Sequence, residues 1–373
     1  MSDDKREEKV RSIKLSGFGG YDCLVVQEES CPRPETGEVT VKVKACGMNF
    51  ADLYTRQGLY TFDGRKPPFV MGMECAGIVK EVGEGVQEFK VGDRVVCWSF
   101  HYGMWSEVSK IPATTCHHIP DSMSFEEAVA MPVSYVTAYL VLFDFGNLRR
   151  GQSVLVQAAA GGLGWAVTQL CKTVEDVVIF GTASAFKHEI IRENGITHAI
   201  DYHSTDFVQE VQSHAPTGVD IIVDSLSGSD FIRSQKVLKH MGRLIHVGIS
   251  NMIGGEKRSL LRALKVWWQM KNVSLLNLTK NNHAVCGFNM GTLTENNPTR
   301  VKEVMAHLIQ LYEEGKIKPR IDSVWSFDEV VKATKKMVNR ENIGKLVLIP
   351  VKEKTDGDPT PQTVDSAVLN PED

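Results

Sequence analysis

The chain has 373 residues, enough for two domains, and its 42% hydrophobic and 24% charged residues are typical of a globular protein. A net charge of −4 gives no basic field for nucleic acid, and no apolar run approaches the ~18 residues of a membrane-spanning helix. The polar start MSDDKREEKV has no signal-peptide pattern and the eight cysteines form no C-x-x-C pair, so we expect a cytoplasmic protein with reduced thiols.

The first third of the chain has the pattern of β-structure. Residues 1–11 form a charged lead that we expect to be disordered. Period-two alternation and glycine turns predict short strands from residue 12 to residue 96. A helix is predicted from residue 123 to residue 143, where Ser124 and Glu127 have the spacing of a capping box.

Strands and helices alternate from residue 153 onward. The predicted strands are 153–158, 176–182, 198–202, 219–225, 242–248 and 284–288. Their spacing is that of a doubly wound parallel sheet, the Rossmann arrangement of an α/β protein. A polar, proline-containing tail, residues 352–373, is expected to be disordered.

A glycine-rich turn follows the first of these strands. Its sequence, AAGGLG, occupies residues 159–164, where an open α/β sheet makes its first crossover. Glycine allows a positive φ and lets the backbone approach a pyrophosphate, which then sits on the helix N-terminus. Many strand–helix turns need glycine for packing alone, so the motif by itself leaves both interpretations open.

The end of the second predicted strand bears on the identity of the cofactor. An NAD site usually places Asp or Glu here to bind the ribose 2′-hydroxyl. No acid lies between Thr182 and His188, and the chain offers Thr182, Ser184 and Lys187 instead, which suit a 2′-phosphate. We therefore expect NADP(H); the alternative is that Lys187 is an ordinary exposed lysine.

Several stretches closely resemble the quinone-oxidoreductase branch of the medium-chain dehydrogenase/reductases. They include CGMNFADLYTRQGLY, GMECAGIVKEVGEGVQEFKVGDRV, AAAGGLG and VDIIVDSLSGSD, and the resemblance covers residues 12–351 in consistent order. The stretches VLFDFGNL, TASAFKHE, VCGF and IKPRIDSVW look more particularly like the vesicle amine transport protein family, which is associated with synaptic vesicles.

The resemblance implies an α/β fold with two domains and an active site in the cleft between them. A GroES-like β-rich catalytic domain would span residues 12–127, and a doubly wound Rossmann domain that binds NADP(H) would span residues 128–290. Residues 291–351 would return to the catalytic domain.

The resemblance also implies a set of cofactor-binding residues. They are Met131, Thr137, Ala160, Gly161, Gly162, Leu163, Thr182, Ser184, Lys187, Tyr202, Ser225, Gly248, Phe288 and Arg340. For Met131 and Phe288 the alternative is plain packing in the core, and Arg340 need not reach the cofactor at all.

The sequence departs from zinc-dependent relatives at the positions of their metal ligands. Where those relatives carry Cys, this chain has Asn49, and where they carry Gly-His-Glu it has Gly72, Met73 and Glu74. An amide and a thioether are poor replacements for the ligands of catalytic zinc. The clustered cysteines of a structural zinc lobe are missing as well, so we expect no bound metal.

Without a Lewis acid, the expected reaction is hydride transfer from NADPH to a quinone or to the β-carbon of an α,β-unsaturated carbonyl compound. The catalytic candidates are Asn49, Tyr54 and Tyr60, the polar side chains of the matching active-site segment. Asn49 could donate an N–H to the carbonyl oxygen as negative charge develops, and either tyrosine could bind the same oxygen. Alternatively, both tyrosines simply line an apolar cleft.

Residues 257–280 contain six Lys or Arg and no Asp or Glu. Their leucines and the pair Trp267–Trp268 fall at spacings that could share one helical face. Tryptophans beside lysines suit a bilayer interface, so peripheral contact with an anionic membrane is one interpretation. The other is a helix that packs its apolar face into a dimer interface or a cleft wall; a homodimer is expected.

Two functions remain open from the sequence. The first is a cytoplasmic, zinc-independent, NADPH-dependent oxidoreductase, favoured by the complete cofactor pocket. The second is a vesicle- or membrane-associated protein that uses the NADP(H)-binding reductase fold as a scaffold with little or no turnover. The family's association with vesicle membranes favours the second.

Overall fold

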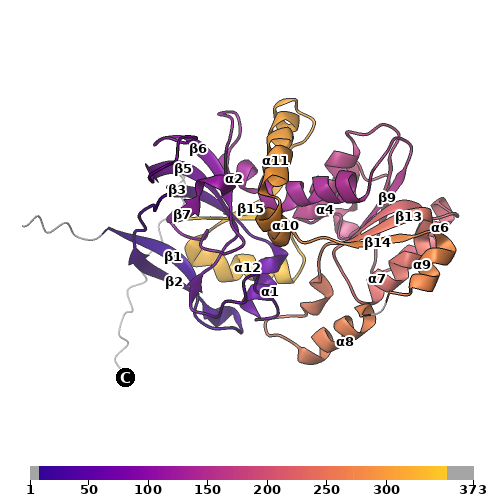
Figure 1. Ribbon diagram of the computed structural model, residues 1–373. Helices are drawn as coiled ribbons and strands as arrows, with labels where there is room; N and C mark the ends of the chain where they lie inside the picture. Colours follow the sequence, from indigo (N-terminus) through magenta and orange to yellow (C-terminus); the bar gives the residue numbers. More distant parts are fainter. Residues whose placement is uncertain (1–7, 272, 351–373) are drawn as a thin grey trace, which may run out of the picture.

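Three β-sheets organise the part of the chain that the computed structural model describes, residues 8–271 and 273–350 (Figure 1). The predicted tail and residues 1–7 of the predicted lead lie outside those ranges. The lead is shorter than predicted, because Lys9–Leu15 already forms strand β1 and pairs along its length with β2 (Leu24–Ser30). Most side chains of β1 are at least half-buried, and burial of its apolar side chains stabilises this early strand.

Strands from both ends of the described chain build the sheet of the first domain. The strand order is β15-β16-β3-β5-β6-β8, with β7 paired to β3. The strands are β3 (Glu38–Gly47), β5 (Glu74–Val82), β6 (Arg94–Trp98), β7 (Val108–Pro112), β8 (Cys116–His118), β15 (Ile321–Ser326) and β16 (Lys345–Ile349). A small sheet, β2-β1-β4, accompanies it, with β4 at Phe69–Val70. The chain therefore crosses the second domain and then returns to the first.

The second domain is built on a six-stranded parallel sheet of order β11-β10-β9-β12-β13-β14. Its strands are β9 (Ser153–Val156), β10 (Val178–Thr182), β11 (His198–Ile200), β12 (Val219–Asp224), β13 (Leu238–His246) and β14 (Ala284–Gly287). Each predicted strand is present, and the parallel sheet confirms the doubly wound α/β class. The strand order reverses between β9 and β12, the topological switch point where such sheets bind ligands.

The helices cover the parallel sheet, link it to the first domain or pack within the first domain. They include α1 (Phe50–Arg56), α4 (Gly162–Cys171), α5 (His188–Asn194), α6 (Phe207–His214), α7 (Ser229–Ser234), α8 (Leu260–Met270), α9 (Leu275–Asn281), α10 (Met290–Asn296), α11 (Pro298–Glu313) and α12 (Val330–Val338). Figure 1 shows α11 where the two domains meet and α8 at the edge of the molecule.

The helix predicted over residues 123–143 is broken into shorter pieces. Its start is confirmed: Ser124 Oγ accepts a hydrogen bond from the Glu127 N–H at 3.1 Å, and the Glu127 carboxylate accepts one from the Ser124 N–H. Helix α2 spans only Phe125–Val129, and π-helical turns then flank the short α3 (Thr137–Tyr139). Pro132 has no N–H to donate, which prevents a continuous α-helix.

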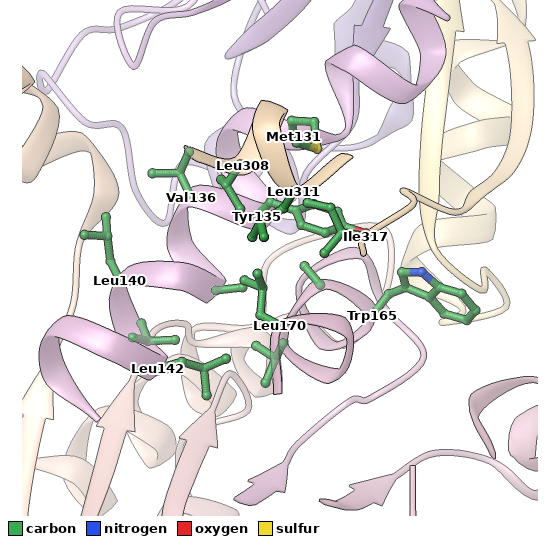
Figure 2. Close-up of a cluster of buried hydrophobic side chains, with 14 of the residues drawn as sticks. Met131, Tyr135, Val136, Leu140, Leu142, Trp165, Leu170, Leu308, Leu311 and Ile317 are labelled. Atoms are coloured by element: carbon green, nitrogen blue, oxygen red, sulfur yellow. The ribbon is translucent and has the colours of Figure 1, made fainter. Parts of the chain in front are cut away.

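A buried cluster joins this broken helix to α4 and α11 (Figure 2). Tyr135 packs among Leu170, Leu308 and Leu311, and its hydroxyl donates to Gln169 Oε1 at 2.7 Å. Each such apolar side chain contributes about 1.5–3 kcal/mol when fully buried. The cluster therefore fixes the direction of α4, whose N-terminus faces the cavity described below.

Candidate active site

A cavity of about 720 Å³ lies between the two domains. It is lined by the β3–α1 junction, the glycine turn before α4, the carboxyl ends of β10, β12 and β13, and the start of β16. All the site residues predicted from the sequence line this cavity except Met131.

Met131 lies in the core instead, where its fully buried side chain belongs to the cluster around Tyr135 (Figure 2). Val133, Ser134 and Thr137 line the cavity from the same segment. The side chain of Met131 instead packs in the core. The structure thus supports core packing, the alternative considered for this residue.

The glycines of this turn differ in their surroundings. A Cβ on Gly164 would lie 2.5 Å from the Ala158 carbonyl oxygen, so this glycine is needed for close packing of α4. Gly161 and Gly162 meet no backbone closer than 3.4 Å and form the cavity-facing start of α4. The N–H groups of a first helical turn form a site suited to a phosphate.

Thr182 holds this turn in place. Its hydroxyl donates to Gln157 Oε1 at 2.7 Å and accepts a hydrogen bond from the Ala158 N–H at 3.1 Å. Ala158 has a φ of 54°, a left-handed conformation that this anchoring stabilises. Thr182 therefore borders the cavity, but its hydroxyl already forms hydrogen bonds to Gln157 and Ala158.

The cavity has a polar end beyond β10, formed by Ser184, Lys187 and Tyr202. The Ser184 and Tyr202 hydroxyls lie 3.2 Å apart. Lys187 is only 5% exposed, which excludes the ordinary exposed lysine. Its ammonium donates to the carbonyl oxygens of Arg340 at 2.6 Å and Asn342 at 2.8 Å. Burial lowers the pKa of Lys187 to about 8.

The donors at this end fit the 2′-phosphate of NADP(H). An ammonium has three N–H groups, and the two carbonyl oxygens use two of those on Lys187. Arg340 also borders the cavity, and its guanidinium donates to Asn251 Oδ1 at 3.2 Å. Ser225, Gly248 and Phe288 line the same cavity.

Asn49 lies at the other end of the cavity, directly before α1. Its side-chain amide donates to Glu74 Oε1 at 2.7 Å and accepts from Lys345 Nζ at 2.7 Å. Lys345 and Glu74 also form an ion pair and are almost completely buried. Sequence reasoning missed Lys345, although a lysine that opens an apolar strand, KLVLI, is a detectable signal.

The two predicted tyrosines differ in their surroundings. Tyr54 is buried, its hydroxyl accepts from the Ile249 N–H at 3.3 Å, and burial raises its pKa well above the ordinary value. Tyr60 is 38% exposed, and its hydroxyl accepts from Asn289 Nδ2 at 3.3 Å. Both line the cavity and connect the first domain to loops of the second.

A histidine–aspartate pair in the cavity wall was also missed by the sequence analysis. His246 Nδ1 lies 2.8 Å from Asp224 Oδ2, and His246 lines the cavity while Asp224 is fully buried. The two residues end the neighbouring strands β13 and β12, so the pair arises from strand register rather than from a local motif.

Within residues 8–271 and 273–350, no group of three or more His, Cys, Asp or Glu side chains could hold a metal ion. No helix of the same ranges is long and apolar enough to cross a membrane.

Comparisons with known proteins agree with this architecture. Residues 35–121 match the model of the alcohol dehydrogenase GroES-like domain, and residues 194–348 match that of the zinc-binding dehydrogenases. The rat synaptic vesicle membrane protein VAT-1 homolog is 50% identical over 349 residues, which cover 92% of this chain and 85% of that protein. The chain belongs to the VAT-1 family.

Two solved structures place this VAT-1 family member among the medium-chain dehydrogenase/reductases. The human VAT-1 homolog-like protein has a TM-score of 0.81 and 39% identity over 93% of this chain and 99% of that one. The Escherichia coli quinone oxidoreductase complexed with NADPH has a TM-score of 0.79 and 26% identity over 91% of this chain and 100% of that one.

Proposed function

We propose that this protein is a zinc-independent, NADPH-dependent oxidoreductase that transfers a hydride to a quinone or an α,β-unsaturated carbonyl compound. The observation that carries the proposal is a single continuous cavity with two different polar ends. One end holds Lys187, Ser184 and Tyr202, and the other holds the Asn49 amide. The E. coli quinone oxidoreductase, which shares the fold, was solved with NADPH and supports this cofactor.

The bound cofactor would supply the hydride. The protein would bind the cofactor and the substrate, orient them and polarise the substrate's carbonyl group. Lys187, Ser184 and Tyr202 would hold the 2′-phosphate, and the N-terminus of α4 would hold the pyrophosphate. Asn49 would donate an N–H to the substrate's carbonyl oxygen. Aromatic side chains that line the cavity, Phe62, Phe100 and Phe288, would limit the access of water.

Turnover of NADPH on a panel of ortho-quinones and α,β-unsaturated ketones tests this proposal. We expect oxidation with at least one class, and Asn49→Ala should lower kcat more than it weakens NADPH binding. The exposed Asn296→Ala, outside the cavity, is the matched control and should change neither value. If NADPH binds but nothing on the panel is reduced, the scaffold function is favoured.

A second function is supported by the surface of α8 and α9. Leu260, Leu261, Leu264, Trp267 and Trp268 all face solvent, whereas Val266 is buried against the Gly228 turn before α7. Leu261 and Trp268 are 82% and 68% exposed. Helix α9 adds Leu275 and Leu276, with 75% and 83% exposed. Exposed apolar patches of this kind mark interaction sites.

Charge favours an anionic bilayer as the partner of this surface. Residues 257–280 carry six basic residues and no acid, and the Lys271 ammonium lies 5.5 Å from the Trp267 ring. Two copies facing each other here would oppose like charges, whereas anionic headgroups would attract them. We infer peripheral attachment of a cytoplasmic protein to vesicle membranes, consistent with relatives named synaptic vesicle membrane proteins.

We also propose that the protein forms a homodimer. Strand β14 ends the parallel sheet, and its outer edge has no partner strand within the described residues. An unpaired edge is suited to pairing with a second copy of the same strand. Light scattering after gel filtration should give twice the chain mass; the mass of one chain would overturn this part.

A further inference from the structure

Three buried polar side chains form a closed ring at the substrate end of the cavity. Asn49 Nδ2 donates to Glu74 Oε1, Lys345 Nζ donates to Asn49 Oδ1, and Lys345 pairs with Glu74. The second Glu74 oxygen accepts from the Val133 N–H at 2.9 Å. The ring joins the β3–α1 junction to β5 and β16.

This ring determines which way the Asn49 amide points. An ammonium can only donate and a carboxylate can only accept, so Oδ1 must face Lys345 and Nδ2 must face Glu74. The opposite orientation would place the NH₂ group against the ammonium and the oxygen against the carboxylate. One N–H of Nδ2 then remains, and Asn49 lines the cavity.

The ring is also attached to the cofactor end of the cavity. Gly344, which precedes Lys345, donates its N–H to the Ala160 carbonyl oxygen at 2.8 Å. A Cβ on Gly162 would lie 3.7 Å from Lys345 Cδ. Strand β16 therefore fixes the position of the Asn49 amide relative to the glycine turn.

We propose that Glu74 and Lys345 are positioning residues that lock the Asn49 amide with its free N–H toward the carbonyl oxygen of the substrate. The inference rests on the proposed reductase function. When the β-carbon of an α,β-unsaturated ketone gains the hydride, the Cα=Cβ π electrons form a new double bond between Cα and the carbonyl carbon, and the carbonyl π electrons move to oxygen. A proton from water then neutralises that oxygen, and the resulting enol tautomerises to the saturated ketone. A donor already aimed at this oxygen needs no reorganisation as the charge develops.

An ion pair that only stabilises the fold would have the same geometry. The test must therefore separate stabilisation of the fold from orientation of the Asn49 amide. Removing one partner of a buried pair leaves an uncompensated charge and can unfold the protein. The double variant Glu74→Gln/Lys345→Met removes both charges with little change in volume. The side-chain amide that replaces the carboxylate can either donate to or accept from Asn49, so the Asn49 amide is no longer locked.

The first readout is kcat, measured for the double variant in the wild-type background and in the Asn49→Ala background. In the wild-type background, the double variant should lower kcat about tenfold with an unchanged Kd for NADPH, because one transition-state hydrogen bond is weakened. In the Asn49→Ala background it should lower kcat no further. Equal losses in both backgrounds would overturn the proposal, since a structural defect does not depend on Asn49.

A readout without turnover keeps this inference separate from the proposed function. The probe is 4-nitrophenol bound to the NADP⁺ complex, whose absorbance reports the phenolate fraction. In the wild type the bound phenol should have a lower pKa than in the double variant, and the two values should coincide in the Asn49→Ala background. That result supports the ring's role even if no substrate turns over, whereas identical values in wild type and double variant would overturn it.

Discussion

Lys187 and Arg340 meet across the domain boundary, where the Lys187 ammonium donates to the Arg340 carbonyl oxygen at 2.6 Å. Lys187 follows β10 of the parallel sheet, and Arg340 lies in the loop between α12 and β16. The contact therefore ties the returning C-terminal segment to the proposed 2′-phosphate site. Because the ammonium is already held in place, a phosphate can use its remaining N–H with little ordering cost.

The first prediction concerns Lys187→Ala. Loss of a charge-assisted hydrogen bond of about 1.5–3 kcal/mol should weaken NADPH binding about 10- to 100-fold, while NADH binding changes little. Calorimetric titration with both cofactors measures this, and the exposed Lys236→Ala serves as a control. An equal loss for NADPH and NADH, or a wild-type preference for NADH, would contradict the 2′-phosphate assignment.

The second prediction concerns Asp52, whose buried carboxylate accepts from the Asn49 N–H at 2.7 Å. Burial raises the pKa of Asp52 from its ordinary value of 3.8 to about 7. Between these values the folded state binds a proton that the unfolded state has lost, so this group's contribution to stability falls as pH rises toward 7. Asp52→Asn should remove this pH-dependent loss of stability, because an amide does not titrate.

Denaturant unfolding at two pH values measures whether the free energy of unfolding changes with pH in this direction. Relative to wild type, Asp52→Asn should gain stability between pH 4 and pH 8, by roughly 2 kcal/mol or more from ~1.4 kcal/mol per pKa unit. The exposed Asp121→Asn should show no such gain. A variant whose difference from wild type is constant with pH, or shrinks as pH rises, would show that Asp52 titrates normally.

The third prediction concerns the α8 surface. Trp267→Ser/Trp268→Ser should greatly reduce salt-sensitive sedimentation with anionic vesicles, because both rings are exposed beside basic residues. Thermal unfolding and NADPH binding should not change. The control, Val91→Ser, alters another exposed apolar side chain, in the first domain, and should leave vesicle binding intact. If wild type and the tryptophan variant sediment equally, α8 is not the membrane contact.

The fourth prediction concerns zinc. The Lys345 ammonium lies against Asn49 and Glu74, close to the positions that carry metal ligands in zinc-dependent relatives, and it would repel a cation there. Purified protein should therefore contain no stoichiometric zinc, and EDTA should leave thermal unfolding and NADPH binding unchanged. Elemental analysis that finds about one zinc per chain would refute this.

The sequence predicted the features that depend on local patterns. The six strands of the parallel sheet, the Ser124–Glu127 cap and the cavity position of Lys187 all follow from spacing or from resemblance to the family. Features that depend on register between distant segments were not predictable in this way. The His246–Asp224 pair comes from neighbouring strands, and Lys345 reaches Asn49 from the last strand.

Met131 and the glycine turn show why some residues stay ambiguous in a sequence. The helix changes from α-helical to π-helical turns at Met131, and in that segment Val133, Ser134 and Thr137 line the cavity while Met131 is buried in the core. In the glycine turn, only the surroundings of each glycine separate close packing at Gly164 from the open approach at Gly161 and Gly162.

The most direct measurement is of deuterium transfer from NADPH to the product. NADPH deuterated at C4, in separate 4R and 4S forms, is incubated with the protein and an α,β-unsaturated ketone, and the product is examined by mass spectrometry. The account predicts that one of the two forms adds a single deuterium to the β-carbon, at a rate lowered by Asn49→Ala. Saturating NADPH binding with neither deuterium in the ketone product nor oxidation of NADPH by a quinone would contradict it.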